Sequence, residues 1–240
     1  MIEFFASLTP NAQKIWIMLE ELGLDYETRM VNVWKGEQFG EAFRALNPNG
    51  KVPVIVDTDG PDGEPYPVFE SGAILIYLAE KHGRLLPAAG VFRYEIIKWL
   101  MIQMSGQGPM SGQFTHFRHH APEGNDYARR RYTSECIRLY EVLDARLGER
   151  SWLGGEEYSV ADIASYPWIR TLARANAAEA GFHTENNPRF PNLWGWAGRI
   201  GARPAVARAL AIIDGTPSTM STSTEDDRDR FFQRGPHERT

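Results

Sequence analysis

The sequence predicts an α/β domain with the element order β-α-β-α-β-β-α, followed by an all-helical domain. Two observations support this fold class. Short apolar runs alternate with helix-period stretches in the first third of the chain, whereas only long helical periods follow Gly83. We therefore expect one domain over residues 1–83, a helical domain over residues 90–214 and a polar tail over residues 215–240.

The first elements indicate a parallel βαβ unit. Residues 2–5 form an apolar run that is too short for a helix and stops before the turn signal Thr9-Pro10-Asn11. Apolar residues then recur at three- and four-residue spacing as far as Gly23, which predicts an amphipathic helix, and β-type residues follow over 26–33. A strand, a short helical crossover and another strand predict a parallel pair.

The rest of the first domain is predicted to contain a helix, a hairpin and another helix. The helix is expected near Phe39 to Leu46. Pro53 to Val56 and Val68-Phe69 flank two Asp-Gly turn signals, which predicts an antiparallel hairpin. Ser71 to His82 then places apolar residues on one helical face, with Gly83 as the stop.

The second domain is predicted to be helical throughout. An apolar stretch beginning near Ile96 meets several glycines and Pro109, so we expect a kinked helix in close contact with its surroundings. A long helix is predicted over residues 125–147. The run Ser159-Val160-Ala161-Asp162 fits a capping box at the start of a buried helix.

Charge and hydropathy exclude several classes of protein. The chain has 26 Lys and Arg against 31 Asp and Glu, a net charge of −5, so no overall basic field attracts nucleic acid or an anionic membrane. No apolar run reaches about 18 residues, and no basic segment precedes a long apolar one near Met1. We expect a cytoplasmic protein with neither a membrane span nor a secretory signal.

The cysteine and histidine contents restrict the redox and metal chemistry. Cys136 is the single cysteine, which excludes an intramolecular disulfide, a redox pair of cysteines and a Cys-rich zinc site. It shares a helix face with Leu139, so we expect a buried packing role. His116, His119 and His120 lack nearby carboxylate ligands, and we expect no metal there.

Two helix starts and one turn are candidates for ligand contact. Thr9 and Ser71 are good N-cap residues, and a helix N-terminus offers unpaired N–H groups and positive potential to an anion. Glu70 beside Ser71 is available for an ammonium group, although both starts are equally consistent with ordinary capping. Between them, residues 47–53 turn into a strand at Val52-Pro53, where we expect a cis bond and pairing with an extended, peptide-like ligand.

Several motifs in the first domain resemble the glutathione transferase superfamily. They are Thr9-Pro10-Asn11, Gly36-Glu37-Gln38-Phe39, Asn47-Pro48-Asn49-Gly50-Lys51-Val52-Pro53 and Phe69-Glu70-Ser71-Gly72-Ala73-Ile74. Two later runs are similar to the helical domain of that superfamily, namely Trp152-Leu153-Gly154-Gly155 and Tyr158-Ser159-Val160-Ala161-Asp162-Ile163-Ala164. In particular, the chain resembles the nu class, the glutathione-dependent disulfide-bond oxidoreductases.

This resemblance covers about residues 1–214 and implies a fold and a ligand. It implies a thioredoxin-like N-terminal domain, an all-helical C-terminal domain, a homodimer, and glutathione as co-substrate. Residue by residue, it puts Glu70 and Ser71 at the γ-glutamyl end of glutathione. It puts Val52, before a cis Pro53, against the cysteinyl backbone, and Gln38 near the glycyl end.

The resemblance also assigns the catalytic residues. It places Thr9 and Asn11 near the glutathione sulfur, where their donors favour the thiolate. Arg131 matches an arginine that reaches across the dimer to glutathione in the neighbouring subunit, although an arginine cluster on a helix is more often a solvated face. No tyrosine precedes Tyr26, which excludes the tyrosine-activated route of several transferase classes.

We predict a glutathione-dependent disulfide-bond reductase that takes both electrons from bound glutathione, because the chain has no second cysteine. Two alternatives remain: a transferase that conjugates glutathione to hydrophobic electrophiles, and a non-catalytic glutathione-binding regulatory module. The expected partners are a small-molecule disulfide or electrophile and a second copy of the chain. An ordered tail is expected to pack on its own or the partner subunit.

Overall fold

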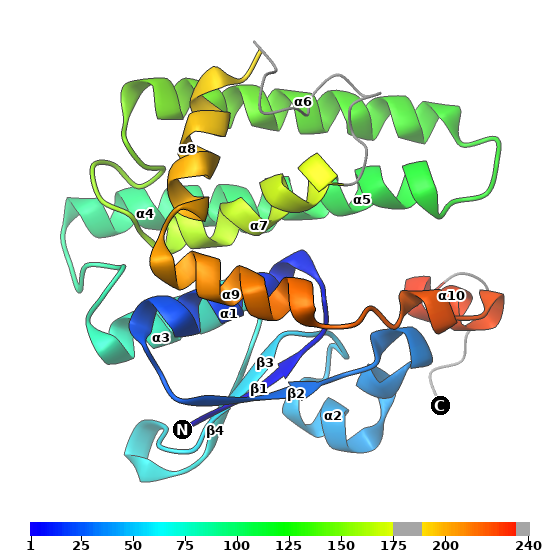
Figure 1. Cartoon of the computed structure of the whole chain (residues 1–240), viewed down its shortest axis with the longest axis horizontal. Helices are drawn as coiled ribbons and strands as arrows, with labels where there is room; N and C mark the ends of the chain where they lie inside the picture. Colours follow the sequence, from blue (N-terminus) through cyan, green and yellow to red (C-terminus); the bar gives the residue numbers. More distant parts are fainter. Residues whose placement is uncertain (175–188, 234–240) are drawn as a thin grey trace. The chain divides into compact units, whose positions relative to one another are not determined.

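The computed structural model describes residues 1–174 and 189–233 (Figure 1). The chain divides into two compact units, Met1–Ile74 with Arg208–Thr240, and Leu75–Ala207. The boundary falls within α3 (Ser71–His82) and within α9 (Pro204–Gly215). The sheet belongs to the first unit and the long helices to the second, which confirms a thioredoxin-like domain combined with an all-helical one.

A four-stranded sheet in the order β2-β1-β3-β4 forms the centre of the first unit. Its strands are β1 (Ile2–Ala6), β2 (Tyr26–Met30), β3 (Val54–Asp57) and β4 (Tyr66–Phe69). Strands β1 and β2 are parallel, and β3 runs antiparallel to both β1 and β4, so the predicted βαβ unit and hairpin are confirmed. Helix α1 (Pro10–Leu22) joins the parallel strands, and its Trp16 packs edge-to-face on Phe4 with ring centroids 5.1 Å apart.

Strand β2 ends at Met30, earlier than the predicted end at Val33. Val31 N–H donates to Ala6 O at 2.8 Å, but Asn32 N–H then donates to the side-chain Oε2 of Glu37 at 2.6 Å. This side-chain acceptor turns the backbone out of the strand. The elements that follow are two 3₁₀ turns, η1 (Val33–Lys35) and η2 (Glu37–Phe39), and the predicted helix, α2 (Glu41–Leu46).

The C-terminal segment, residues 216–233, contains more regular structure than the polar tail that the sequence predicts. It has a 3₁₀ turn, η6 (Met220–Thr222), and a helix, α10 (Glu225–Phe232). Thr224 and Asp227 form a capping box: Asp227 N–H donates to Thr224 Oγ1 at 3.2 Å, and Thr224 N–H donates to Asp227 Oδ2 at 2.9 Å. Figure 1 shows α10 beside the turns that follow β2, so the segment packs on its own unit.

The second unit is helical. A π-helical turn, η4 (Gln103–Gln107), separates its first two helices where the sequence predicts a kink. Gly108 permits the close approach there, because a Cβ on it would lie 2.9 Å from Gln103 Nε2. None of the described helices is both long and apolar enough to cross a bilayer. The helices are α4 (Val91–Ile102), α5 (Gly108–His119), α6 (Asp126–Glu149), α7 (Val160–Arg174) and α8 (Pro191–Gly201).

The predicted helix start at Ser159 is confirmed, with one half of the capping box: Asp162 accepts from Ser159 N, whereas Ser159 Oγ accepts from Ala161 N at 3.3 Å rather than from Asp162 N. Asp162 is fully buried, and its carboxylate accepts from Ser159 N at 3.0 Å, from Leu153 N at 3.0 Å and from Trp196 Nε1 at 2.8 Å. Burial raises the pKa of this carboxyl, while these hydrogen bonds lower it. One side chain therefore ties the start of α7 to the preceding loop and to α8.

Cys136 is 1% exposed on α6, as the sequence predicts. Burial raises the pKa of its thiol to about 12, although a hydrogen bond with Ser111 opposes the rise. The thiolate is the nucleophilic form of cysteine, so this residue is inert near neutral pH. Cys136 is a packing residue.

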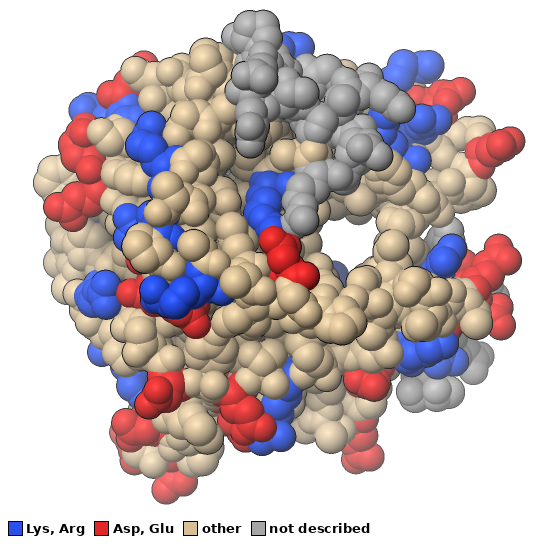
Figure 2. Space-filling view, viewed as in Figure 1, with Lys and Arg blue, Asp and Glu red and all other residues tan. Residues whose placement is uncertain are grey.

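Charged side chains of both signs are interspersed on the face shown in Figure 2. Blue and red side chains alternate there rather than gathering into one basic block. This distribution agrees with the small net charge of −5.

Candidate functional site

Three of the predicted site segments meet at one edge of the sheet. Phe5 at the end of β1 pairs with Val54 at the start of β3, and Val54 pairs with Phe69 at the end of β4. The residues just outside these pairs therefore leave the sheet at the same edge. They are the loop that leads to Thr9, the turn at Val52-Pro53 and the pair Glu70-Ser71.

Thr9 is the N-cap of α1. Its Oγ1 accepts from Ala12 N at 3.3 Å, and Pro10 occupies the first turn, as capping chemistry predicts. A hydroxyl has one donor hydrogen besides its acceptor lone pairs, so the Thr9 O–H can still donate to an anion in front of the helix. Asn11 lies in the first turn of the same helix and is half-buried.

The turn at Val52-Pro53 has the predicted cis peptide bond. Asn47 holds this turn from inside: its side chain is 1% exposed, its Nδ2 donates to Lys51 O at 2.7 Å, and its Oδ1 accepts from Asn49 N at 3.0 Å. Within the described residues, no loop hydrogen bond involves the N–H or C=O of Val52. The Val52 backbone is thus free to pair with an extended ligand.

Glu70 has a left-handed backbone, with φ of +67°. Residues other than glycine rarely adopt this conformation, which costs on the order of 1–3 kcal/mol and often marks a functional position. Its C=O accepts from Ile74 N at 2.9 Å as the first bond of α3, so Glu70 rather than Ser71 occupies the N-cap position. Within the part of the chain that the structure describes, the exposed carboxylate accepts one long bond, from Asn49 Nδ2 at 3.4 Å.

Ser71 is the first residue of α3 and is buried. Its Oγ accepts from Lys14 Nζ at 3.1 Å, and Lys14 is itself only 1% exposed. Burial lowers the pKa of the Lys14 ammonium to about 7, while the charge of Glu70 raises it. A buried amine therefore lies behind the Glu70-Ser71 pair.

Lys14 is a buried residue beside the predicted site that sequence reasoning misses. In an amphipathic helix, a lysine is expected on the solvated face. Helix α1 is instead buried along most of its length, including its polar residues Gln13 and Lys14. The sequence offers one indication that Lys14 lies near the site, namely its position in the helix whose N-cap is Thr9.

Gln38 lies in η2 and is 3% exposed. Its Nε2 donates to Val33 O at 3.1 Å, and its buried Oε1 has no hydrogen-bond partner among the described residues. The side chain is enclosed by its own loop. Its contact with the glycyl end of glutathione stays a prediction.

Arg131 belongs to α6 in the second unit. Its side chain is 54% exposed and pairs with Glu135 on the next turn, with Nη1 and Oε2 3.2 Å apart. An exposed pair of this kind contributes little to stability. Its predicted role across a dimer interface stays a prediction.

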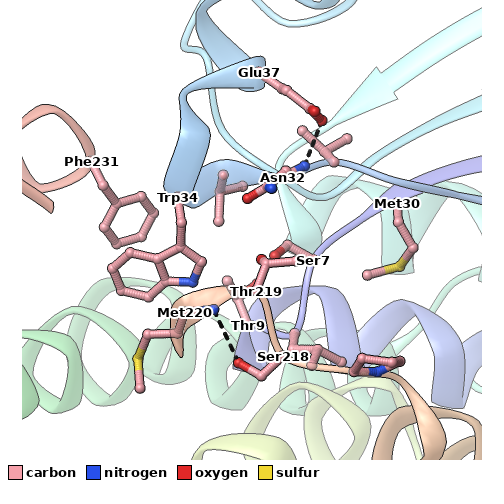
Figure 3. Close-up of a pocket in the computed structure, with 14 residues that line it drawn as sticks. Ser7, Thr9, Met30, Asn32, Trp34, Glu37, Ser218, Thr219, Met220 and Phe231 are labelled. Atoms are coloured by element: carbon pink, nitrogen blue, oxygen red, sulfur yellow. Dashed lines mark hydrogen bonds between the residues drawn. The ribbon is translucent and has the colours of Figure 1, made fainter. Parts of the chain in front are cut away.

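A cavity of about 230 Å³ lies beside Thr9 (Figure 3). Of the predicted site residues, only Thr9 lines it. The other walls come from the chain after β2 and from the C-terminal segment. Trp34, in the chain after β2, faces Phe231 of the C-terminal segment (Figure 3). The lining residues are Ser7, Leu8, Thr9, Met30, Val31, Asn32, Val33, Trp34, Glu37, Pro217, Ser218, Thr219, Met220 and Phe231.

Among residues 1–174 and 189–233, no group of three or more His, Cys, Asp or Glu side chains is arranged to hold a metal ion. The histidines of α5 instead make ring contacts, for example His116 with Phe117 at 5.3 Å between centroids.

Comparisons with known proteins agree with this architecture. The family model "Glutathione S-transferase, N-terminal domain" matches residues 9–81, and "Glutathione S-transferase, C-terminal domain" matches residues 126–199. The disulfide-bond oxidoreductase YfcG of Escherichia coli is 45% identical over 211 residues, which cover 88% of this chain and 94% of that protein.

Solved structures give the same result. A glutathione transferase family member from Pseudomonas fluorescens, crystallised with two glutathione bound, is 44% identical with a TM-score of 0.81 and covers 87% of this chain and 92% of its own. A glutathione transferase from Pseudomonas putida, crystallised with one glutathione disulfide per subunit, is 43% identical with a TM-score of 0.81 and covers 88% and 91%. The chain described here belongs to the glutathione S-transferase family.

Proposed function

We propose that this protein is a glutathione-dependent disulfide-bond reductase that works with the thiols of bound glutathione. The observation that carries the proposal is the sheet edge where the N-cap Thr9, the unpaired backbone of Val52 and the left-handed Glu70 come together. The activity printed for the relative YfcG and the glutathione in the solved neighbours support it.

The edge fits a γ-linked tripeptide. The Glu70 carboxylate can accept from the α-ammonium of the γ-glutamyl residue, and the first turn of α3 at Ser71 offers N–H groups to its α-carboxylate. The N–H and C=O of Val52 can pair with the cysteinyl backbone. This arrangement directs the cysteinyl sulfur to Thr9 and Asn11, and Gln38 remains the proposed contact for the glycyl end.

The residues of the first turn of α1 stabilise the thiolate. A free thiol has a pKa of about 8.5, so only a small part is ionised at pH 7. The Thr9 hydroxyl, the Asn11 amide and the positive end of α1 favour the anion and so increase the nucleophilic fraction.

Disulfide reduction then proceeds in two exchange steps. The thiolate of one glutathione attacks a sulfur of the substrate, forms a mixed disulfide and releases one substrate thiolate, which takes up a proton. The thiolate of a second glutathione attacks the glutathione sulfur of that mixed disulfide. This step forms oxidised glutathione and releases the other substrate thiol, so two glutathiones supply both electrons.

We further propose a homodimer in the cytoplasm, in which Arg131 of each subunit contacts glutathione bound to the other. The support is the family resemblance together with the exposure of Arg131 and the lack of a cysteine pair. Sedimentation of the intact chain tests the dimer. An Arg131→Ala variant that stays dimeric and keeps its KM for glutathione would remove this role.

The Glu70 carboxylate gives a direct test of the glutathione site. Glu70→Gln is expected to raise the KM for glutathione about tenfold with little change in kcat, because it removes one charge-assisted contact made throughout the reaction. The assay measures reduction of 2-hydroxyethyl disulfide by glutathione with a recycling reductase. Glu64→Gln, an exposed acid in the hairpin turn, is the matched control.

The outcomes separate the alternatives. Glutathione binding without turnover of any disulfide or electrophile would indicate a regulatory module. Turnover of electrophiles alone would indicate conjugation. An unchanged KM in Glu70→Gln would contradict the proposed placement of the γ-glutamyl end.

A further inference from the structure

Lys14 is a buried titratable residue that the proposed reaction does not use. It lies on α1, one turn after Asn11, and is 1% exposed. Its Nζ donates to Ser71 Oγ at 3.1 Å, although the two residues are 57 positions apart in the chain. Ser71 is itself only 2% exposed. The amine therefore reaches the start of α3 from inside the domain rather than from solvent.

The protonation of this amine depends on its surroundings. A lysine is almost never fully buried unless it is paired, because burial disfavours the charged form. Burial lowers the pKa of Lys14 to about 7, and the charged group that acts on it is Glu70, whose carboxylate raises the pKa. At neutral pH the amine is therefore divided between its charged and neutral forms. A new charge bound close to it changes this division.

The first turn of α3 brings such a charge near the amine. N–H groups at a helix N-terminus have no partner inside the helix and carry positive potential. In the proposed placement of glutathione, the α-carboxylate binds at Ser71, one hydroxyl group away from Lys14 Nζ, and the α-ammonium binds at Glu70. The carboxylate is thus the nearer of these two ligand charges to Lys14. Buried charges are screened less than exposed ones, so this interaction favours the ammonium form of Lys14.

We propose that Lys14 is a positioning residue of the glutathione site, and that it takes up a proton from solution when the γ-glutamyl carboxylate binds at the start of α3. The proposal rests on the proposed function, because it uses the proposed placement of glutathione. An ammonium only donates, so it holds Ser71 Oγ as an acceptor and lets the hydroxyl hydrogen turn to the carboxylate. A neutral amine can instead accept from that hydroxyl. Glutathione therefore binds most tightly to the protonated protein, and its affinity falls as the pH rises through 7.

Proton uptake tests this coupling in the full chain. The probe is S-methylglutathione, because its sulfur is blocked and does not titrate. Calorimetry at pH 7 compares the heat of binding in PIPES and in imidazole, two buffers with different heats of ionisation. We expect an uptake of about 0.4 proton per ligand, since the amine is half protonated before binding and mostly protonated afterwards. Binding without proton uptake would overturn this inference and leave the proposed glutathione site intact.

Lys14→Met assigns the proton to this residue. Methionine has a similar volume and no amine, so proton uptake should disappear. Between pH 6 and pH 8, the Kd of the unmodified protein for S-methylglutathione should rise about fivefold, whereas that of Lys14→Met should stay nearly constant. Lys98→Met, which removes a lysine that is 62% exposed, is the matched control and should retain both effects. Proton uptake that persists in Lys14→Met would belong to another group and would overturn the inference.

NMR follows the amine itself. The Cε signal of Lys14, identified by its loss in Lys14→Met, should titrate near pH 7 in the ligand-free protein. With S-methylglutathione bound, it should titrate about one pH unit higher. Titration at the same pH in both states, or near the ordinary lysine pKa of about 10.4 in the ligand-free protein, would overturn the inference alone. Absence of S-methylglutathione binding at every pH would overturn the proposed function and this coupling with it.

Discussion

Lys14→Met is expected to stabilise the folded protein at pH 7 and to weaken glutathione binding. Burial lowers the pKa of Lys14 to about 7, and a lowering of this size corresponds to roughly 5 kcal/mol of disfavoured charge. Methionine fills a similar volume without that cost but leaves Ser71 Oγ without this donor. We therefore expect a net gain of about 1–3 kcal/mol in the free energy of unfolding.

The pH dependence identifies the cause. The unfolded chain holds the lysine proton up to its ordinary pKa of about 10.4, whereas the folded protein releases it near pH 7. Between these two pKa values the unfolded state therefore binds more protons than the folded state. The contribution of Lys14 to the free energy of unfolding thus becomes more favourable as the pH rises above 7. Below pH 7 both states are charged and the burial cost is present in full. The gain from Lys14→Met should therefore be largest at pH 6.5 and smaller at pH 8.5.

Denaturant unfolding of the unmodified protein and of Lys14→Met over pH 6.5–8.5 measures the difference in their free energies of unfolding. The protonation of all other groups contributes equally to both proteins and cancels in this difference. The same variant is expected to raise the KM for glutathione at least about tenfold, because Ser71 Oγ loses the Lys14 Nζ donor that holds its side chain in place. Lys98→Met is the control, since this lysine is 62% exposed and pairs with Glu95. A pH-independent difference in stability, or an unchanged KM, would contradict the role of Lys14.

Thr9→Val is expected to lower kcat/KM for disulfide reduction by about 10- to 100-fold. The change keeps the shape of the side chain and removes the hydroxyl donor to the thiolate, and a hydrogen bond to a charged group contributes about 1.5–3 kcal/mol. The pH at which activity reaches half its maximum should rise, because the thiolate is less favoured. Steady-state kinetics over a range of pH check both effects.

Loss of the helix cap is the competing explanation for Thr9→Val. The hydroxyl also accepts from Ala12 N, so the variant should lose about 1 kcal/mol of stability by capping alone. Thr9→Ser retains both the cap and the donor and should retain most of the activity. A Thr9→Ser variant as impaired as Thr9→Val, or a Thr9→Val variant with normal pH dependence, would exclude the thiolate role.

The parts of the site that follow local rules could be predicted from the sequence. Thr9 opens α1, Pro53 follows a cis bond, and the Asp162 side chain accepts from Ser159 N at the start of α7. Each depends on residues within a few positions of one another. The same holds for the start of α3, although Glu70 rather than Ser71 takes the N-cap position.

The missed features depend on contacts between distant parts of the chain. Lys14 is buried because tertiary packing covers α1 on nearly all sides, which helical periodicity does not reveal. Helix α10 was hidden in a charge run, and its partner Trp34 lies far earlier in the chain. The capping box at Thr224 and Asp227 was the local signal that could have revealed this helix.

In the proposed reaction, glutathione and not the protein supplies the reacting thiols. The most direct measurement is the rate of 2-hydroxyethyl disulfide reduction by Cys136→Ala, in which the single cysteine is absent. We predict a rate within about twofold of the unmodified protein, since the Cys136 thiol is buried with a pKa of about 12. Loss of the reaction in a folded Cys136→Ala protein would show that the protein thiol takes part in it.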